Sequence, residues 1–132
     1  MAKRFTVTLS VRSYELDSFG HVNNAVYLQY LEYARCEYMA QQGLSFSDFH
    51  AWGAYPYVVH VDIDYKASSR TGDVLELTGW VSEWGRSSFV LSYEVHNHTT
   101  GKLAALAHVK FAWVNDRERI IPVPPLFKER MS

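Results

Sequence analysis

The chain has 132 residues, of which 48% are hydrophobic and 20% charged, so it can build a core and is not a disordered protein. A net charge of −1 argues against a general nucleic-acid-binding protein. One cysteine, no apolar signal region and no apolar run of membrane-spanning length together predict a cytoplasmic protein with no membrane partner.

Taken in chain order, the first half predicts a strand, a long helix and a short helix. Residues 5–14 alternate between apolar and polar side chains, which is typical of a half-buried strand. From Asn24 the period becomes helical, and Gly43 stands where a C-terminal cap belongs. Residues 45–48 resemble the capped start of a short helix that ends near Gly53. The apolar stripe of the long helix consists of Tyr27, Tyr30, Leu31, Ala34 and Tyr38.

The second half predicts strands only, over residues 57–65, 74–83, 88–96 and 102–114. The prolines of the tail cannot continue a central strand. Residues 1–132 therefore form one domain of the α+β class, with one sheet curled around one helix. Few elements remain to cover that sheet, so an outer face or an edge is expected to need a partner subunit.

Asp17 is the candidate with the clearest chemistry. It lies in a turn-like segment just before the long helix, and a carboxylate beside unpaired helix amides suits acyl transfer. Such an aspartate also serves as a cap or turn residue in many proteins. His21 is either a general acid or a hydrogen-bonding support of the turn. Asn23 and Asn24 could contact a substrate, although asparagine is also a good N-cap.

These residues carry a resemblance. The run D-S-F-G-H-V-N-N-x-x-Y from Asp17 to Tyr27, followed by L-E-Y-A-R, resembles the hotdog-fold acyl-CoA thioesterases of the 4-hydroxybenzoyl-CoA thioesterase type. The resemblance covers nearly the whole chain, and includes the segment from Glu83 to Phe89. It implies a five-stranded antiparallel sheet wrapped around one long central helix, and hydrolysis of an acyl-CoA to the free acid and CoA without a cofactor. It also implies a site between two subunits of a homodimer or homotetramer.

The resemblance assigns roles to single residues. Asp17 matches the nucleophile or general base, and the backbone amide of Asn24 matches the group that binds the thioester carbonyl. His21 is a further catalytic candidate because of its place in the turn, not because of the resemblance. Several family members have an aromatic or histidine side chain at the Asn24 position, which bears on substrate fit more than on activity, since the contact is a backbone amide. The candidate contacts with substrate or CoA are Gly20, Asn23, Tyr27, Arg86, Ser87 and Ser88. Tyr27 is more typical of a core or interface residue, and Arg86 is either a phosphate contact or a solvated turn residue.

Two other functions stay open at this point. An acyl-carrier-protein thioesterase resembles this chain closely around Asp17, and a non-catalytic acyl-binding module could use the same fold. A metal site is not expected. Asp62 and Asp64 form one pair of possible ligands and His96 and His98 form another, but the spacing marks no third ligand for either pair. The acyl group itself is not specified by the sequence.

Overall fold

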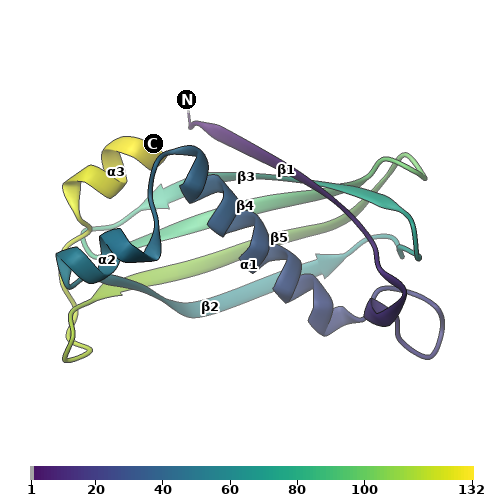
Figure 1. Cartoon of the computed structure of the whole chain (residues 1–132), viewed down its shortest axis with the longest axis horizontal. Coiled ribbons are helices and arrows are strands. Elements are labelled where there is room, and N and C mark those ends of the chain that lie inside the picture. The colour runs from purple at the N-terminus through teal and green to yellow at the C-terminus, as the bar shows by residue number, and fades with distance from the viewer. Residues whose placement is uncertain (1) are drawn as a thin grey trace.

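A computed structural model of the chain describes residues 2–132 and consists of a sheet, one long helix and three shorter helical segments (Figure 1). The elements in chain order are β1 (Arg4–Ser10), η1 (Ser13–Glu15), α1 (Asn24–Gln41), α2 (Phe46–Trp52), β2 (Tyr55–Tyr65), β3 (Val74–Trp84), β4 (Ser88–Asn97), β5 (Lys102–Val114) and α3 (Pro125–Met131).

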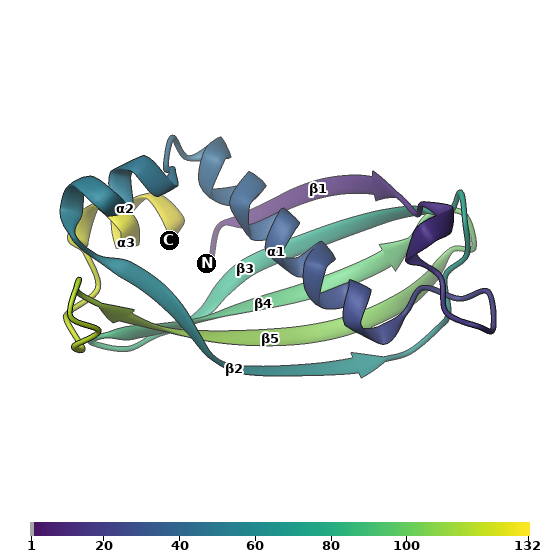
Figure 2. The same ribbon diagram turned by 60° about the horizontal axis from the view of Figure 1, so that its bottom comes forward.

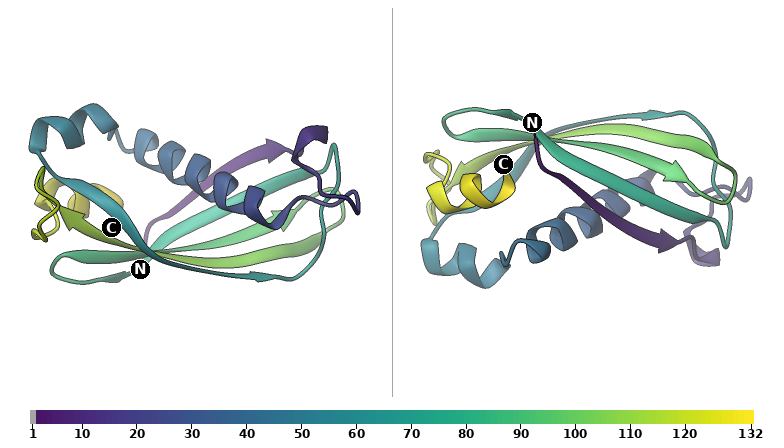
Figure 3. Two further views of the ribbon diagram at one scale, coloured as in Figure 1. Left: turned by 90° about the horizontal axis from the view of Figure 1, so that it is seen from below. Right: turned by 90° about the horizontal axis from the view of Figure 1, so that it is seen from above.

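The five strands form one antiparallel sheet in the order β1-β3-β4-β5-β2. The sheet curves around α1, which runs along one face, while α2 and α3 gather at one end (Figures 2 and 3). This arrangement confirms the expected α+β class and the five-stranded sheet wrapped around one long helix.

Helix α1 packs on the sheet through the predicted stripe, whose five members are all buried. Tyr38 also bonds to the sheet, because its hydroxyl donates to the carbonyl of Leu77 at 2.6 Å. A Cβ atom at Gly79 of β3 would lie 2.4 Å from the Tyr38 ring, so only glycine lets this ring reach the sheet. The helix begins where predicted, because the Asn23 side chain accepts from the amide of Ala25.

The ends of the shorter elements were predicted with mixed success. Helix α2 has the expected capping box between Ser45 and Asp48, and ends at Gly53, which has a φ of 62°. Helix α3 was not predicted. Its Pro125 occupies the first turn, where proline costs no hydrogen bond, and the helix buries Phe127 and Met131.

The predicted first strand, residues 5–14, was too long. β1 ends at Ser10, and the chain then makes one turn of 3-10 helix, η1. The reason is Glu15, whose carboxylate accepts from the amide of Arg12 at 2.8 Å and so folds the segment back on itself. Val11 keeps its predicted buried place, since it follows β1 directly and is only 3% exposed.

β2 is an edge strand with an unusually apolar exposed surface. Tyr57 is 44% exposed, Val58 45% and Val59 57%, and a bulge interrupts the pairing with β5 between Val58 and His60. The predicted alternation of buried and exposed residues is therefore absent along most of β2. Protein edges of this kind are normally protected by charge, by a cover or by a partner strand.

Candidate active site

The loop from Leu16 to Val22 holds Asp17 at the N-terminal end of α1. Leu16 and Val22 form an antiparallel bridge that closes the loop, and Gly20 turns it with a φ of 77°. The amide of Val22 donates to the carbonyl of Ser69, so the loop is also tied to the segment between β2 and β3. Gly20, predicted as a substrate contact, thus has a clear role in the turn.

One oxygen of Asp17 shapes the loop and the other is available. Oδ1 accepts from the amide of Phe19 at 2.9 Å and from the amide of His21 at 3.2 Å. Among residues 2–132, no group donates to Oδ2 of Asp17. The carboxylate is therefore oriented by the backbone while one oxygen remains unpaired. The residue acts as a turn residue and can also attack or accept a proton.

The first turn of α1 presents an unpaired backbone donor. The Asn23 side chain accepts from Ala25 and the Asn23 carbonyl accepts from Val26, whereas the Asn24 amide has no acceptor among the described residues. Helix geometry leaves such N-terminal amides without intrahelical partners, and they favour negative charge. Asn23 therefore serves as the cap, and the Asn24 amide is the donor that is left over.

Asp17, His21, Asn24 and Tyr27 line one recess of about 310 Å³, so the structure brings these four predicted site residues together. The Tyr27 ring forms its buried wall and is only 4% exposed, which places this residue in the core as well as at the site. Burial is the main cause that raises the pKa of the Tyr27 hydroxyl.

Sequence reasoning missed the other side of the recess, which the end of β2 and the following loop supply. Tyr65 packs edge-on against Tyr27, with ring centroids 5.5 Å apart, and its hydroxyl donates to the Asn24 carbonyl at 3.0 Å. Lys66 and Ser68 complete the lining. No local pattern marks these residues, because they reach α1 only through the position of β2 in the sheet.

Behind the loop lies an ionic network centred on the buried carboxylate of Glu15. Glu15 is 5% exposed and accepts from the Arg12 amide, the Arg12 guanidinium and the Tyr30 hydroxyl. Burial opposes the ionisation of Glu15, but these hydrogen bonds outweigh it and lower its pKa. The Glu15 carbonyl also accepts from the Asn23 amide at 2.9 Å, so the network supports the residue that caps α1.

Arg86, Ser87 and Ser88 do not lie at this recess within one chain. Arg86 and Ser87 occupy the turn between β3 and β4, and Ser88 is the first residue of β4, at the end of the molecule where α2 and α3 lie (Figure 1). The carbonyl of Arg86 accepts from the Val123 amide, and that of Ser87 from the Trp113 amide. These contacts fix the backbone of the turn and leave the Arg86 side chain exposed.

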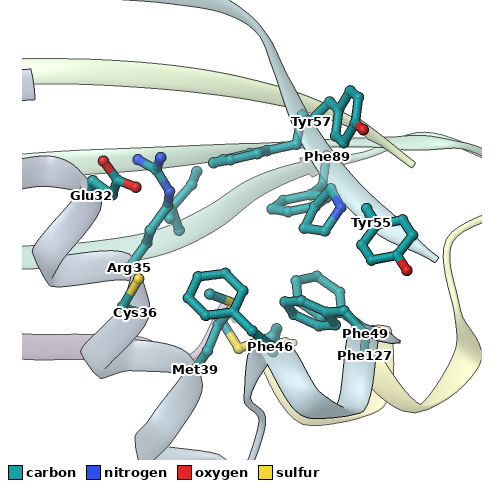
Figure 4. Close-up of a pocket in the computed structure, with 14 residues that line it drawn as sticks. Glu32, Arg35, Cys36, Met39, Phe46, Phe49, Tyr55, Tyr57, Phe89 and Phe127 are labelled. Atoms are coloured by element: carbon teal, nitrogen blue, oxygen red, sulfur yellow. The ribbon is translucent and has the colours of Figure 1, made fainter. Parts of the chain in front are cut away.

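An apolar cavity of about 250 Å³ lies at the same end, between the C-terminal half of α1, helices α2 and α3, and the start of β2. Phenylalanine rings and Met39 form most of its wall, while Glu32 and Arg35 lie together at one end (Figure 4). Cys36 is half-buried and lines this cavity rather than filling the core, and burial is the main cause that raises the pKa of its thiol.

Within residues 2–132, no helix is both long and apolar enough to cross a membrane. These residues also contain no cluster of three or more His, Cys, Asp or Glu side chains that could hold a metal ion.

The profile of the Thioesterase-like superfamily matches residues 11–131. The chain belongs to this superfamily. The expected enzyme class, thioester hydrolase, is thereby confirmed for the family to which the chain belongs.

Named relatives agree with this assignment. The long-chain acyl-CoA thioesterase FadM of Escherichia coli is 32% identical over 111 residues, which cover 81% of this chain and 80% of that protein. The acyl-acyl carrier protein thioesterase ATL3 of Arabidopsis thaliana is 23% identical over 98% of this chain and 68% of its own length. A 1,4-dihydroxy-2-naphthoyl-CoA thioesterase from Synechocystis superposes on this chain with a TM-score of 0.90 and 21% identity. The superposition covers 98% of this chain and 96% of that one, and it confirms the hotdog fold.

Proposed function

We propose that the protein hydrolyses an acyl-CoA to the free acid and CoA, with Asp17 as the reacting carboxylate and the Asn24 amide at the start of α1 as the donor that polarises the thioester carbonyl. The observation that carries this proposal is the presence of both groups in one recess: an oriented carboxylate with one unpaired oxygen, and the unpaired Asn24 amide.

The chemistry follows from these two groups. A thioester carbonyl gains negative charge on its oxygen when a nucleophile adds to carbon, and a fixed amide donor stabilises that charge by about 3–4 kcal/mol. Asp17 either adds to the carbon itself, forming a mixed anhydride that water then hydrolyses, or removes a proton from the attacking water. In both routes the C–S bond breaks, and CoA leaves as the thiolate. His21, at the rim of the recess, is the candidate for proton transfer.

A second substrate class is supported by a relative. ATL3 is named an acyl-acyl carrier protein thioesterase, so a carrier-protein thioester is the alternative substrate. Rates measured on the CoA and carrier-protein thioesters of one acyl chain distinguish the two. A non-catalytic acyl-binding module would release no thiol from either.

We also propose that the active form is a homodimer or homotetramer that pairs along β2. The exposed apolar side chains on this edge strand support the proposal, because such a surface is normally covered. A two-fold pairing would bring the β3–β4 turn of one chain to the same end of the assembly as Asp17 of the other. Arg86, Ser87 and Ser88 would then contact CoA from the partner side, with the guanidinium near a phosphate.

The test is Asp17→Asn, which keeps the shape of the side chain and removes its charge. Thiol release from the best acyl-CoA should fall by about a hundredfold or more, while the circular dichroism spectrum stays unchanged. Glu129→Gln is the matched control, because this exposed carboxylate lies on α3, at the opposite end of the molecule from the recess (Figure 1). Turnover by Asp17→Asn close to that of the control would refute the assignment.

A further inference from the structure

The apolar cavity beneath α2 and α3 is not used by the chemistry at Asp17. Its walls are largely hydrocarbon, and the hydroxyl group of Tyr55, which also borders it, donates to the Asp116 carboxylate at 2.9 Å. A cavity of about 250 Å³ that borders the surface is within reach of a ligand.

We propose that this cavity receives the hydrocarbon chain of an acyl thioester whose carbonyl is held at the Asp17 recess of a second copy of the chain. The inference rests on the proposed thioesterase function and on pairing along β2, and it names the acyl class and the residues that select it.

Distances along β2 favour the second copy over the same chain. The cavity lies at the Tyr55 end of β2, and the Asp17 recess lies at the Tyr65 end. β2 has 11 residues, so its two ends are about 33 Å apart. An acyl chain held at Asp17 would have to run the length of its own molecule to reach its own cavity.

Two-fold pairing removes that separation. A symmetric interface between two identical edge strands places the same strand of each chain side by side, and an antiparallel pair puts Tyr55 of one beside the partner's Tyr65. Paired strands are only about 4.8 Å apart. The cavity of one chain then lies next to the recess of the other, and the sheets of both chains continue into each other with their α1 helices on one side.

The size and lining of the cavity define the acyl group. An apolar protein cavity of 150 Å³ holds benzene, so about 250 Å³ corresponds to roughly ten carbon atoms. The deep wall, which includes Phe49, Phe89 and Phe127, offers no partner for a hydroxyl group, and an unpaired hydroxyl is costly there. Met39 can adjust to a flexible chain. The class that fits is an unsubstituted aliphatic acyl chain whose terminal part, roughly ten carbons, fills the cavity.

Cys36→Phe tests the cavity directly. The residue is half-buried on α1, so its side chain can be enlarged into the cavity without moving the helix. We expect kcat/KM for dodecanoyl-CoA to fall about tenfold or more, and that for butanoyl-CoA to change less than twofold. Ala40→Phe is the matched control, since it adds the same ring to an exposed position of the same helix.

Phe46→Ala provides the opposite change. This ring is 64% exposed and lines the cavity, so its removal should leave the fold intact and enlarge the space. The preferred chain should become longer. If neither Cys36→Phe nor Phe46→Ala changes the chain-length profile relative to Ala40→Phe, the cavity is not the acyl site. If Cys36→Phe does not fold, Phe46→Ala alone decides.

Mixed dimers test whether the cavity acts on the partner's thioester. An Asp17→Asn chain and a Cys36→Phe chain can be co-expressed with different tags and purified as the heterodimer. This heterodimer contains one intact site only if the carboxylate and the cavity of a site come from different chains. We expect the heterodimer to show about half the wild-type rate per dimer on dodecanoyl-CoA. A heterodimer no faster than the mean of the two parents would refute the exchange between subunits.

These outcomes are separable from a failure of the proposed function. If the wild-type protein releases no thiol from any acyl-CoA or carrier-protein thioester, the thioesterase proposal itself is wrong. If it hydrolyses short and long chains alike, and the Cys36→Phe profile equals that of Ala40→Phe, the function stands and only the acyl cavity is wrong.

Discussion

Tyr30→Phe should destabilise the protein by an amount that depends on pH. The variant removes only the hydroxyl that donates to Oε1 of Glu15 at 2.8 Å, and both residues are almost fully buried. A hydrogen bond to a charged group contributes about 1.5–3 kcal/mol to stability. With an unfolding entropy of about 2.1 cal/mol/K per residue, a chain of this length should lose about 5–11 °C in Tm at pH 7.

The pH dependence follows from the pKa of Glu15. Its hydrogen bonds outweigh the effect of burial and hold the pKa in the folded state below the ordinary value. A carboxyl group of this kind stabilises the fold at pH values above its unfolded pKa, about 4.3, and that contribution is lost as the pH falls through the folded pKa. The Tm difference between wild type and Tyr30→Phe should therefore be full at pH 7 and shrink below about pH 4.

Calorimetry at pH 7 and at pH 3 measures both effects, and Tyr33→Phe is the matched control. Tyr33 borders the same surface groove as Tyr30, but it is 46% exposed, so water can bond its hydroxyl. An equal Tm loss in both variants, or the same gap at both pH values, would refute the role assigned to the Glu15 network. Because Glu15 also holds the Asn23 amide, Tyr30→Phe should lower turnover as well.

Three further predictions follow from the fold and the proposed assembly. Arg86→Ala should raise KM for an acyl-CoA several-fold with little change in kcat, and should have no such effect on an acyl-pantetheine. An equal rise in KM for both substrates would mean that Arg86 supports the fold instead. Gly79→Ala should lower stability by about 1–3 kcal/mol, measured by urea unfolding, because the added methyl group would meet the Tyr38 ring; a stable variant would show that this ring can move away. Val61→Lys should convert the oligomer to monomer in sedimentation experiments and remove activity, whereas a fully active monomer would exclude a site that needs two chains.

Local patterns in the sequence were enough for the elements whose geometry depends on neighbouring residues. The start of α1 at Asn24 follows from the asparagine cap and the change to helical period, and α2 follows from Ser45, Asp48 and Gly53. The same holds for the loop around Asp17, where carboxylate, glycine and cap lie within a few residues of one another. The side-chain hydrogen bonds that shape the Asp17 turn and the two helix caps join residues at most four positions apart.

Only the tertiary structure decided which distant segments meet that loop. Tyr65 reaches the start of α1 because β2 occupies the edge of the sheet next to β5, and Arg86 lies at the far end because the β3–β4 turn points away from the loop. The cavity between α1, α2 and α3 likewise depends on where α3 packs. Strand order and helix packing are set by the burial of apolar surface over the whole chain. The local spacing of apolar residues shows which face of a strand or helix is buried, but it does not show which other element covers that face.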